Sequence, residues 1–541
     1  MAETTTLYGN FDYIIAGAGS AGCLLANRLS ADPACRVLLL EAGGDDKWRW
    51  LHIPVGYLYC IGNPDTDWCF TTHPDAGLNG RSIAYPRGRV LGGSSAINGM
   101  IYMRGQREDY DGWKAAGNAG WGWDDVLPLF RKFESHYAGD SAIHGGTGEL
   151  RVEQQRLRWA ILDAFREAAE EAGIPKIDDF NGGNNEGSSY FQVTQKKGVR
   201  FSAASAFLRP IKERSNLTII TNAMIDRVNF NGRTAQGLQF RHNDHFFHAN
   251  ATHEVILSAG AIGSVQILQR SGIGAGDLMQ SLGIPLIHHL PGVGRNLQDH
   301  LQLRMIYKVS RARTLNTMMQ SPLAKAYMGL QYALMKKGPL TMAPSQLGLF
   351  ARSSSRHSRA NVEYHVQPLS LEKFGEGLHP FPAFTASVCN IRPTSRGTVA
   401  IVSPSLESRP DILCNYLSTD EDVQVALDSI RLTRRIAAAS ALEKYSPQEW
   451  RPGPLAKTDD DLIRAASNIG TTIFHPVGTC KMGNDDMAVV DATLKVHGVN
   501  GLRVVDASIM PTITSGNTNA PAMLIAEKGA QLILASRQAH R

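Results

Sequence analysis

The chain has 541 residues, with 55 Lys and Arg against 50 Asp and Glu and a formal net charge of +5. Hydrophobic residues make up 43% and charged residues 19%, which is ordinary for a globular protein and excludes a disordered chain. The length exceeds that of one typical domain, so we expect two structural units. The small net charge, with no run of Lys or Arg, argues against nucleic-acid binding.

The cysteines and the N-terminus predict the compartment. Seven scattered cysteines without a C-x-x-C pair argue against a disulfide framework and a zinc site, and we predict no metal ligands. The N-terminus lacks the basic and apolar regions of a signal peptide, and no apolar run approaches the roughly 18 residues of a membrane span. We therefore predict a cytoplasmic protein without a transmembrane segment. Peripheral membrane association and the oligomeric state stay open.

The first forty residues have the pattern of a βαβ unit. Phe11–Ala16 is a short apolar run that predicts a buried parallel strand, and Arg36–Leu40 predicts a second one. Between them, a glycine turn at Gly17–Gly22 leads into apolar residues at helical spacing. Glu41 follows the second strand directly.

The turn is a G-x-G-x-x-G sequence, and each glycine has a physical task. Gly17 allows a tight turn, Gly19 lets a pyrophosphate approach the backbone, and Gly22 lets helix and strand pack closely. The helix N-terminus offers free N–H groups to the phosphates. Glu41 is placed to accept hydrogen bonds from a ribose 2′-hydroxyl, which disfavours NADP. This unit predicts dinucleotide binding but does not separate NAD from FAD.

The later chain predicts a second domain and a return to the first. Residues 45–86 are irregular and aromatic, which is typical of a lid, and residues 157–172 predict an amphipathic helix. Alternation over residues 218–247 around Asn231-Gly232 predicts a hairpin. Strands such as Asn361–Gln367 and Thr398–Val402, followed by helices after Thr419, predict a domain built on an antiparallel sheet.

The predicted fold class is therefore α/β, α+β overall, with a Rossmann-like dinucleotide-binding domain that is discontinuous in sequence and a substrate domain whose antiparallel sheet is flanked by helices. We assign residues 1–156, 201–319 and 458–541 to the first domain, and residues 157–200 and 320–457 to the second.

Two segments favour a flavin over a nicotinamide. Val255–Gly260 is an apolar strand that ends in small residues, where backbone can pass close to a cofactor. Leu502–Ala507 is a late strand that ends in Asp506, and it is similar to the strand that places an Asp near the ribityl and pyrophosphate of FAD. The alternative for Asp506 is a cap on the following turn.

Four blocks of the sequence resemble the signatures of the glucose–methanol–choline (GMC) oxidoreductases. They are Gly88–Asn98 with its continuation to Tyr102 and Gly105, Gly260–Gly274, His475–Gly483 and Asp506–Glu527. One departure is Val265, where the family usually has Pro or Ser. The resemblance covers the chain from about Phe11 to Leu534, with the blocks in the order that the family has. Within the family, the sequence most resembles bacterial alcohol and choline dehydrogenases.

The resemblance implies FAD as the cofactor. Family members with covalent flavin have a histidine just before the asparagine of the first block; here Ile97 precedes Asn98, so non-covalent FAD is implied. The cofactor-binding residues that we predict are Gly17, Gly19, Ser20, Ala21, Glu41, Ala42, Arg89, Gly92, Ser95, Asn98, Gly99, Ile101, Met224, Ala259, Gly260, Asp506, Ala507 and Thr518.

The resemblance also implies the catalytic pair. His475 is the implied acceptor of the hydroxyl proton, and an imidazole suits that task near neutral pH. Asn517 is the implied partner that binds the alkoxide oxygen, with Asn519 as the alternative. Phe474 is expected near the substrate carbon, or else in the core.

The predicted function is FAD-dependent oxidation of a primary alcohol to the aldehyde, with hydride transfer to flavin N5 and oxygen or another acceptor taking the electrons. A medium-chain or aromatic alcohol is expected, with choline as the next candidate. The alternatives are a hydroxynitrile lyase on the same fold and an NAD-dependent dehydrogenase.

Overall fold

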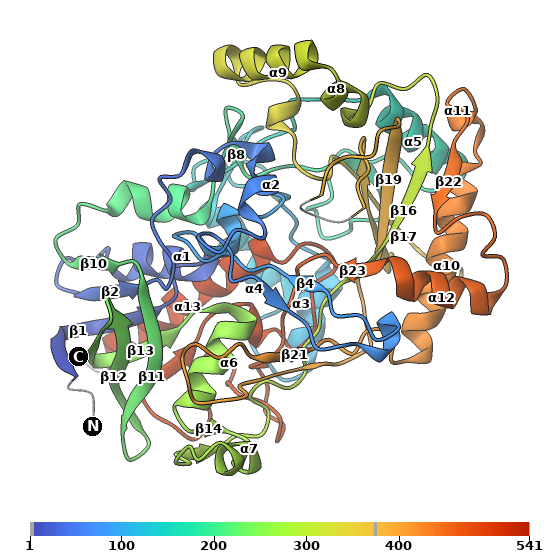
Figure 1. The fold of residues 1–541 in the computed structure, drawn as a ribbon. Helices are drawn as coiled ribbons and strands as arrows, with labels where there is room; N and C mark the ends of the chain where they lie inside the picture. The colour runs from blue at the N-terminus through green and yellow to red at the C-terminus, as the bar shows by residue number, and fades with distance from the viewer. Residues whose placement is uncertain (1–4, 373–375, 540–541) are drawn as a thin grey trace.

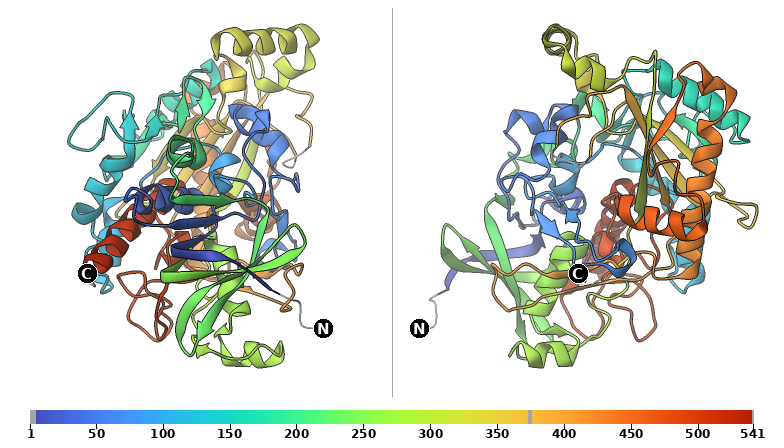
Figure 2. Two further views of the ribbon diagram at one scale, coloured as in Figure 1. Left: turned by 90° about the vertical axis from the view of Figure 1, so that its left-hand side faces the viewer. Right: turned by 45° about the vertical axis from the view of Figure 1, so that its right-hand side comes forward.

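The computed structural model describes residues 5–372 and 376–539, and it is organised around two large sheets. Figure 1 shows the first sheet at the lower left and the second at the right, with the chain crossing between them more than once. The views in Figure 2 show the same two bodies from other sides, with the segment that carries helices α8 and α9 projecting above both.

The first sheet has the strand order β10-β2-β1-β13-β12-β11, with β24 also paired to β13. The strands from β10 to β13, together with β24, are parallel, whereas β11, β12 and β13 are antiparallel neighbours. The bounds are β1 Thr6–Ala16, β2 Val37–Leu40, β10 Leu217–Ile220, β11 Ala223–Asn231, β12 Thr234–His242, β13 His245–Leu257 and β24 Leu502–Val504.

The predicted βαβ unit is confirmed. Helix α1, Ser20–Leu29, packs on β1 and β2, and β2 is fully buried because its sequence is entirely apolar. The predicted hairpin is confirmed as β11 and β12, with Gly232 at φ 58° in the turn. Helix α13, Asn519–Ala539, packs against α1, so the end of the chain completes the first domain.

The second sheet is antiparallel, as predicted. Its order is β22-β16-β19-β18-β17-β7, with β23 also paired to β16. Helices α5, α10 and α12 lie along its outer side (Figure 1). The bounds are β7 Gly187–Tyr190, β16 Leu301–Lys308, β17 Leu347–Ala351, β18 Val362–Gln367, β19 Ala383–Asn390, β22 Gln448–Arg451 and β23 Gly470–Thr472.

Two strands of the second sheet stand outside the ranges assigned to it from sequence. Strand β16 falls within 201–319 and β23 within 458–541, yet both pair in the second sheet. The segment 398–402 forms β20, Thr398–Ala400, which pairs with β21 in a separate small sheet rather than in the large one. Periodicity identifies a strand but does not choose its partner, which explains these differences.

The remaining elements are short strands and the other helices. Residues 45–86 hold only short elements, as a lid would. The other strands are β3 Phe70–Thr71, β4 Ala84–Tyr85, β5 Glu134–His136, β6 Leu150–Val152, β8 Gln195–Lys196, β9 Val199–Arg200, β14 Ile273–Gly274, β15 His288–His289 and β21 Asp411–Leu413. The other helices are α2 Tyr57–Cys60, α3 Arg107–Ala115, α4 Trp123–Phe133, α5 Ala160–Glu171, α6 Gly260–Arg270, α7 Gly276–Ser281, α8 Leu315–Gln320, α9 Pro322–Met335, α10 Asp420–Ala437, α11 Ser440–Glu443 and α12 Asp459–Ile469.

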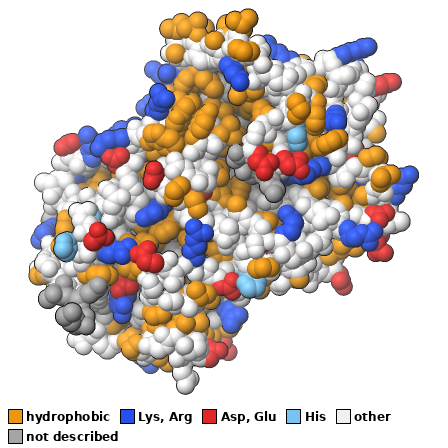
Figure 3. Space-filling view, in the orientation of Figure 1, with side chains coloured by type: hydrophobic (Ala, Val, Ile, Leu, Met, Phe, Trp, Pro, Cys, Tyr) orange, Lys and Arg blue, Asp and Glu red, His pale blue; other side chains and the backbone are white. Residues whose placement is uncertain are grey.

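The surface over α9 is unusual in composition. Figure 3 shows hydrophobic side chains gathered at the top of the molecule, in the place that α8 and α9 occupy in Figure 1. Among the described residues, no helix combines the length and the apolar character that crossing a bilayer requires.

Candidate active site

A cavity of about 550 Å³ opens between the two domains. The glycine turn, the block around Gly93 and the start of α13 form one side of it, and the second sheet forms the other. The two sheets therefore face each other across a space that both help to shape.

The cavity brings together almost all of the predicted cofactor residues. Every one of them lines it except Gly92 and Ser95, whose neighbours Gly93 and Ser94 line it instead. The Ser95 hydroxyl is already engaged, because it donates to the Gly92 carbonyl at 2.6 Å and accepts from the Ala203 N–H at 2.9 Å. Ser95 thus holds the turn, and its side chain is not offered to a ligand.

The glycines of the first turn leave room where a cofactor needs it. A Cβ on Gly22 would lie 1.9 Å from the Gly17 carbonyl oxygen, so strand and helix touch there as predicted. A Cβ on Gly19 would meet its nearest neighbour only at 3.9 Å, which leaves this backbone open to the cavity. A Cβ on Gly93 would lie 2.7 Å from Gly19 Cα, so the two glycine-rich segments pack backbone against backbone.

Polar groups around this cradle fit a dinucleotide such as FAD. The N-terminus of α1 carries no side-chain cap, so its N–H groups remain for phosphate. The Glu41 carboxylate accepts from the N–H groups of Ala18 at 2.9 Å and Gly43 at 2.8 Å, and burial raises its pKa to about 7. Arg89 Nε is buried and has no hydrogen-bond partner among the described residues, so it is available to a ligand.

Asp506 connects two segments that line the cavity on the cofactor side. Its carboxylate accepts from the Gly260 N–H at 2.9 Å and from the Ser264 hydroxyl at 2.6 Å, so it joins the end of β24 to the start of α6. It also accepts from the N–H of Ser508, which is the cap considered as the alternative. Asp506 therefore caps the following turn and also lines the cavity.

His475 and Asn517 meet at the floor of the cavity. The Asn517 amide nitrogen lies 3.0 Å from His475 Nε2, while Nδ1 of the same ring lies 3.0 Å from Nδ1 of His300. If the amide donates to Nε2, the ring proton of neutral His475 sits on Nδ1 and donates to His300. Nε2 is then the nitrogen that can accept a proton.

Burial keeps both imidazoles uncharged. It lowers the pKa of His475 well below the ordinary value, and the nearby side chains of His300, His365 and Arg87 act in the same direction. Burial lowers the pKa of His300 to about 3. His475 is therefore deprotonated at neutral pH, as a general base must be before it acts.

The buried carboxylate of Asp299 fixes the backbone of His475 and His300. Its carboxylate accepts from the backbone N–H of His475 at 2.8 Å and of His300 at 2.9 Å. It also accepts from three hydroxyls, those of Tyr85, Tyr416 and Thr472. A buried carboxylate with five donors holds the backbone of both histidines in place. Neither Asp299 nor His300 was predicted, because only the pairing of β16 with β23 brings residues 299–300 beside residue 475.

Phe474 lines the cavity and has a strained backbone. Its φ of 72° is rare for a bulky residue, and two contacts maintain it. Its N–H donates to the Thr472 hydroxyl at 2.7 Å, and its carbonyl accepts from Arg87 at 2.6 Å. This turn aims the His475 ring into the cavity.

The two candidate asparagines have different contacts. Asn517 contacts His475, and its Oδ1 is buried without a partner among the described residues. Asn519 instead accepts from the Ser20 hydroxyl at 2.7 Å, at the first residue of α13. The positive end of this long helix lies at the cavity, where it favours negative charge.

The substrate side of the cavity is rich in aromatic side chains. Tyr57, Trp68 and Phe70 from the 45–86 segment line it together with Phe474. The second sheet and the loop before β17 add Gln302, Pro344, Ser345, His365 and Gln367. The carboxylates in the lining are Glu41, Glu407 and Asp506; Glu41 and Asp506 belong to the cofactor cradle, and Glu407 pairs with Arg241.

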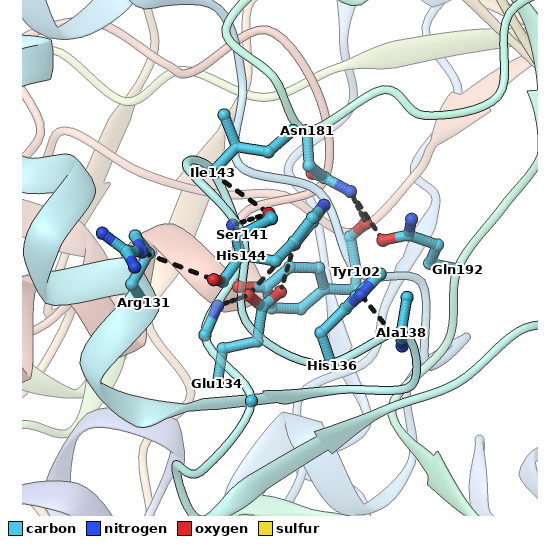
Figure 4. Close-up of polar contacts among 12 residues, drawn as sticks. Tyr102, Arg131, Glu134, His136, Ala138, Ser141, Ile143, His144, Asn181 and Gln192 are labelled. Atoms are coloured by element: carbon cyan, nitrogen blue, oxygen red, sulfur yellow. Dashed lines mark hydrogen bonds and ion pairs between the residues drawn. The ribbon is translucent and has the colours of Figure 1, made fainter.

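A second cluster of histidines lies outside the cavity lining. Figure 4 shows His144 beside His136, with Glu134 bonded to the His144 ring. His144 Nδ1 lies 3.0 Å from Glu134 and Nε2 lies 2.5 Å from Asp179, while Arg104 reaches Glu134 at 2.7 Å. Because both ring nitrogens of His144 already contact carboxylates, the cluster forms a charge-balanced network of two cations and two anions. It fixes the end of the glycine-rich block at Arg104.

The glycine-rich βαβ turn, the second antiparallel domain and the buried histidine–asparagine pair between them fit a cofactor-dependent oxidoreductase. The pattern of the GMC oxidoreductases matches this chain over residues 11–302 and 393–526. The chain belongs to the GMC oxidoreductase family, as the four sequence blocks predicted.

Several similar proteins have assigned activities. An alcohol dehydrogenase [acceptor] from Pseudomonas putida is 42% identical over 97% of this chain and 96% of its own length. The mitochondrial choline dehydrogenase of Homo sapiens is 40% identical over 97% of this chain and 89% of its own. Among solved structures, pyridoxine 4-oxidase from Mesorbium loti superposes with a TM-score of 0.88 at 31% identity, covering 98% of this chain and all of that one.

Proposed function

We propose that the protein oxidises a primary alcohol to the aldehyde with non-covalently bound FAD. The observation that carries this proposal is the 3.0 Å contact between His475 Nε2 and the Asn517 amide inside the cavity. A neutral Nε2 accepts the hydroxyl proton, and the Asn517 amide donates to the developing alkoxide oxygen. Bound FAD supplies the acceptor for the hydride that leaves the carbinol carbon.

The chain's own residues orient the alcohol. As His475 gains a proton at Nε2, its Nδ1–H donates more strongly to His300, which stabilises the positive ring. The N-terminus of α13 lines the same cavity and favours negative charge there. The aromatic lining excludes water around the carbon that is oxidised.

A neutral alcohol fits the substrate side better than choline. The second sheet and the loop before β17 contribute no carboxylate to the described lining, and Glu407, which also lines the cavity, already pairs with Arg241. The aromatic rings of Tyr57, Trp68, Phe70 and Phe474 suit a medium-chain or aromatic alcohol, and choline stays the second candidate because rings also attract cations.

Two further points of the proposal concern the flavin linkage and the compartment. Ile97 has no nucleophilic atom to attach a flavin, which supports a non-covalent cofactor. All seven cysteines are unpaired, which supports a reducing compartment such as the cytoplasm. Acid precipitation of the holoprotein should release all yellow FAD into the supernatant; yellow pellets would refute non-covalent binding.

The test of function is the anaerobic visible spectrum of the purified holoprotein with aliphatic alcohols, benzylic alcohols and choline. Bleaching by a neutral primary alcohol is expected, and readmitting air then shows whether oxygen accepts the electrons. Asn517→Ala should slow flavin reduction by orders of magnitude with FAD still bound. Asn519→Ala is the matched control, since that amide contacts Ser20 instead of His475. A yellow protein that releases cyanide from a cyanohydrin, and that no alcohol bleaches, would refute oxidation in favour of a lyase.

A further inference from the structure

Helix α9 presents its apolar side to solvent. Only two of its residues, Met328 and Tyr332, are buried against the protein. Leu323, Leu330 and Leu334 are 83%, 58% and 74% exposed. With Tyr327, they repeat at spacings of four, three and four residues, which places them on one face of the helix. In an ordinary surface helix such a stripe faces the core.

Exposed apolar side chains also stand before and after these four residues. Met319 in α8 is 39% exposed and Met335 at the end of α9 is 55% exposed. Figure 3 shows these helices as a hydrophobic crest, with Lys and Arg side chains around its sides. Contiguous apolar surface of this kind marks a binding face rather than a chance exposure.

The segment that carries the stripe has charges of one sign only. Residues 300–362 contain ten Lys and Arg and no Asp or Glu, although the whole chain is nearly balanced at 55 to 50. Lys325, Lys336 and Lys337 belong to α9 or follow it directly. An apolar face edged by lysines suits an anionic bilayer surface, which takes the leucines among its acyl chains and pairs the lysines with its headgroups.

A second copy of the chain fits this surface less well. Two α9 helices packed stripe to stripe would bring lysines together with no described carboxylate in the same segment to balance them. We propose that α9 is an interfacial membrane anchor that lies in the plane of an anionic lipid surface without crossing it.

The anchor lies beside the active-site cavity. After α9, the 3₁₀ turn Pro339–Thr341 packs against another such turn, Pro54–Gly56, in the 45–86 segment. Each turn leads directly into the cavity wall, at Pro344 and at Tyr57. Docking of α9 therefore places the aromatic side of the cavity near the bilayer, where apolar alcohols concentrate.

The test is flotation of the FAD-loaded protein with vesicles of phosphatidylethanolamine and phosphatidylglycerol, compared with vesicles of phosphatidylcholine alone. The wild type should bind the anionic vesicles more tightly, and high salt should weaken this binding. Leu330→Asp with Leu334→Asp should lower the partition coefficient at least ~10-fold, because charge replaces two leucines that enter the acyl chains when α9 docks. Lys336→Gln with Lys337→Gln should lower binding to anionic vesicles by roughly 5-fold per lysine.

Leu455→Asp is the matched control, because this leucine is 89% exposed outside α8 and α9 and should leave flotation unchanged. All variants should retain the wild-type flavin spectrum and turnover of a water-soluble alcohol, since α9 contributes nothing to the cavity lining. Equal flotation of the Leu330/Leu334 variant and the wild type would overturn the proposal. So would a lipid-free dimer that this variant converts to a monomer, with no vesicle binding by the wild type.

Discussion

Replacement of His300 by leucine tests whether this residue tunes the base. The 3.0 Å contact from His475 Nδ1 to His300 Nδ1 is fully buried, so water cannot replace it when the acceptor is lost. An unsatisfied buried donor costs about 1 to 3 kcal/mol, and the cost rises as the ring becomes charged in the transition state. His300→Leu should therefore reduce the flavin-reduction rate by roughly 5- to 150-fold, at about 1.4 kcal/mol per factor of ten.

The assay is anaerobic stopped-flow reduction of the FAD-loaded protein by a substrate alcohol. His300→Asn is the rescue variant, because its amide oxygen can stand where Nδ1 stood and accept the same proton; most of the rate should return. His497→Leu is the matched control, since it also removes one 3.0 Å hydrogen bond from an imidazole, but outside the cavity lining. A normal rate in His300→Leu with FAD bound would refute the role assigned to the pair.

Three other predictions follow from the same geometry. Because the pKa of His475 is held well below 6.5, flavin reduction should stay constant as the pH falls to that value, and a midpoint above it in the pH–rate profile would contradict this assignment. Gly22→Ala should abolish FAD binding or lower Tm sharply, whereas Gly19→Ala should be far milder, because the nearest atoms to the added methyl groups stand at 1.9 Å and 3.9 Å; equal melting and FAD content in both variants would argue against it. The contacts of His144 with Asp179 and Glu134 raise its pKa against the opposing effect of burial, so its contribution to stability is present below the unfolded-state pKa and is lost as the pH rises through the folded-state value. Urea unfolding of the wild type and of His144→Gln should therefore differ more at pH 5 than at pH 9, and an unchanged difference would exclude this linkage.

Local patterns in the sequence predicted the first domain well. The apolar run before Gly17, the glycine spacing and the late strand at 502–505 each carry their signal in a few adjacent residues, and the structure joins them in one sheet. The same is true of the hairpin around Gly232, where a single dipeptide specifies the turn.

The parts that sequence reasoning missed depend on pairing at long range. Nothing near Asp299 or His300 distinguishes them from other polar residues, and they reach His475 only through the register of β16 with β23. The surroundings of His475 are equally invisible in sequence, because its lowered pKa arises from burial by segments that lie far apart in the chain.

The pairing of β24 with β13 has a consequence for biosynthesis. Residues 255–257 of β13 use one edge to bind β1 and the other to bind residues 502–504. While the ribosome is still making the chain between them, that second edge stays without its partner, and an unpaired edge invites association with other chains. When the last forty residues fold, β24 pairs with the open edge of β13, and the segment that follows β24 brings Asn517 to His475. A chain released before that point would lack both a finished sheet and a finished catalytic pair, so quality control that removes incomplete sheets would remove inactive enzyme as well.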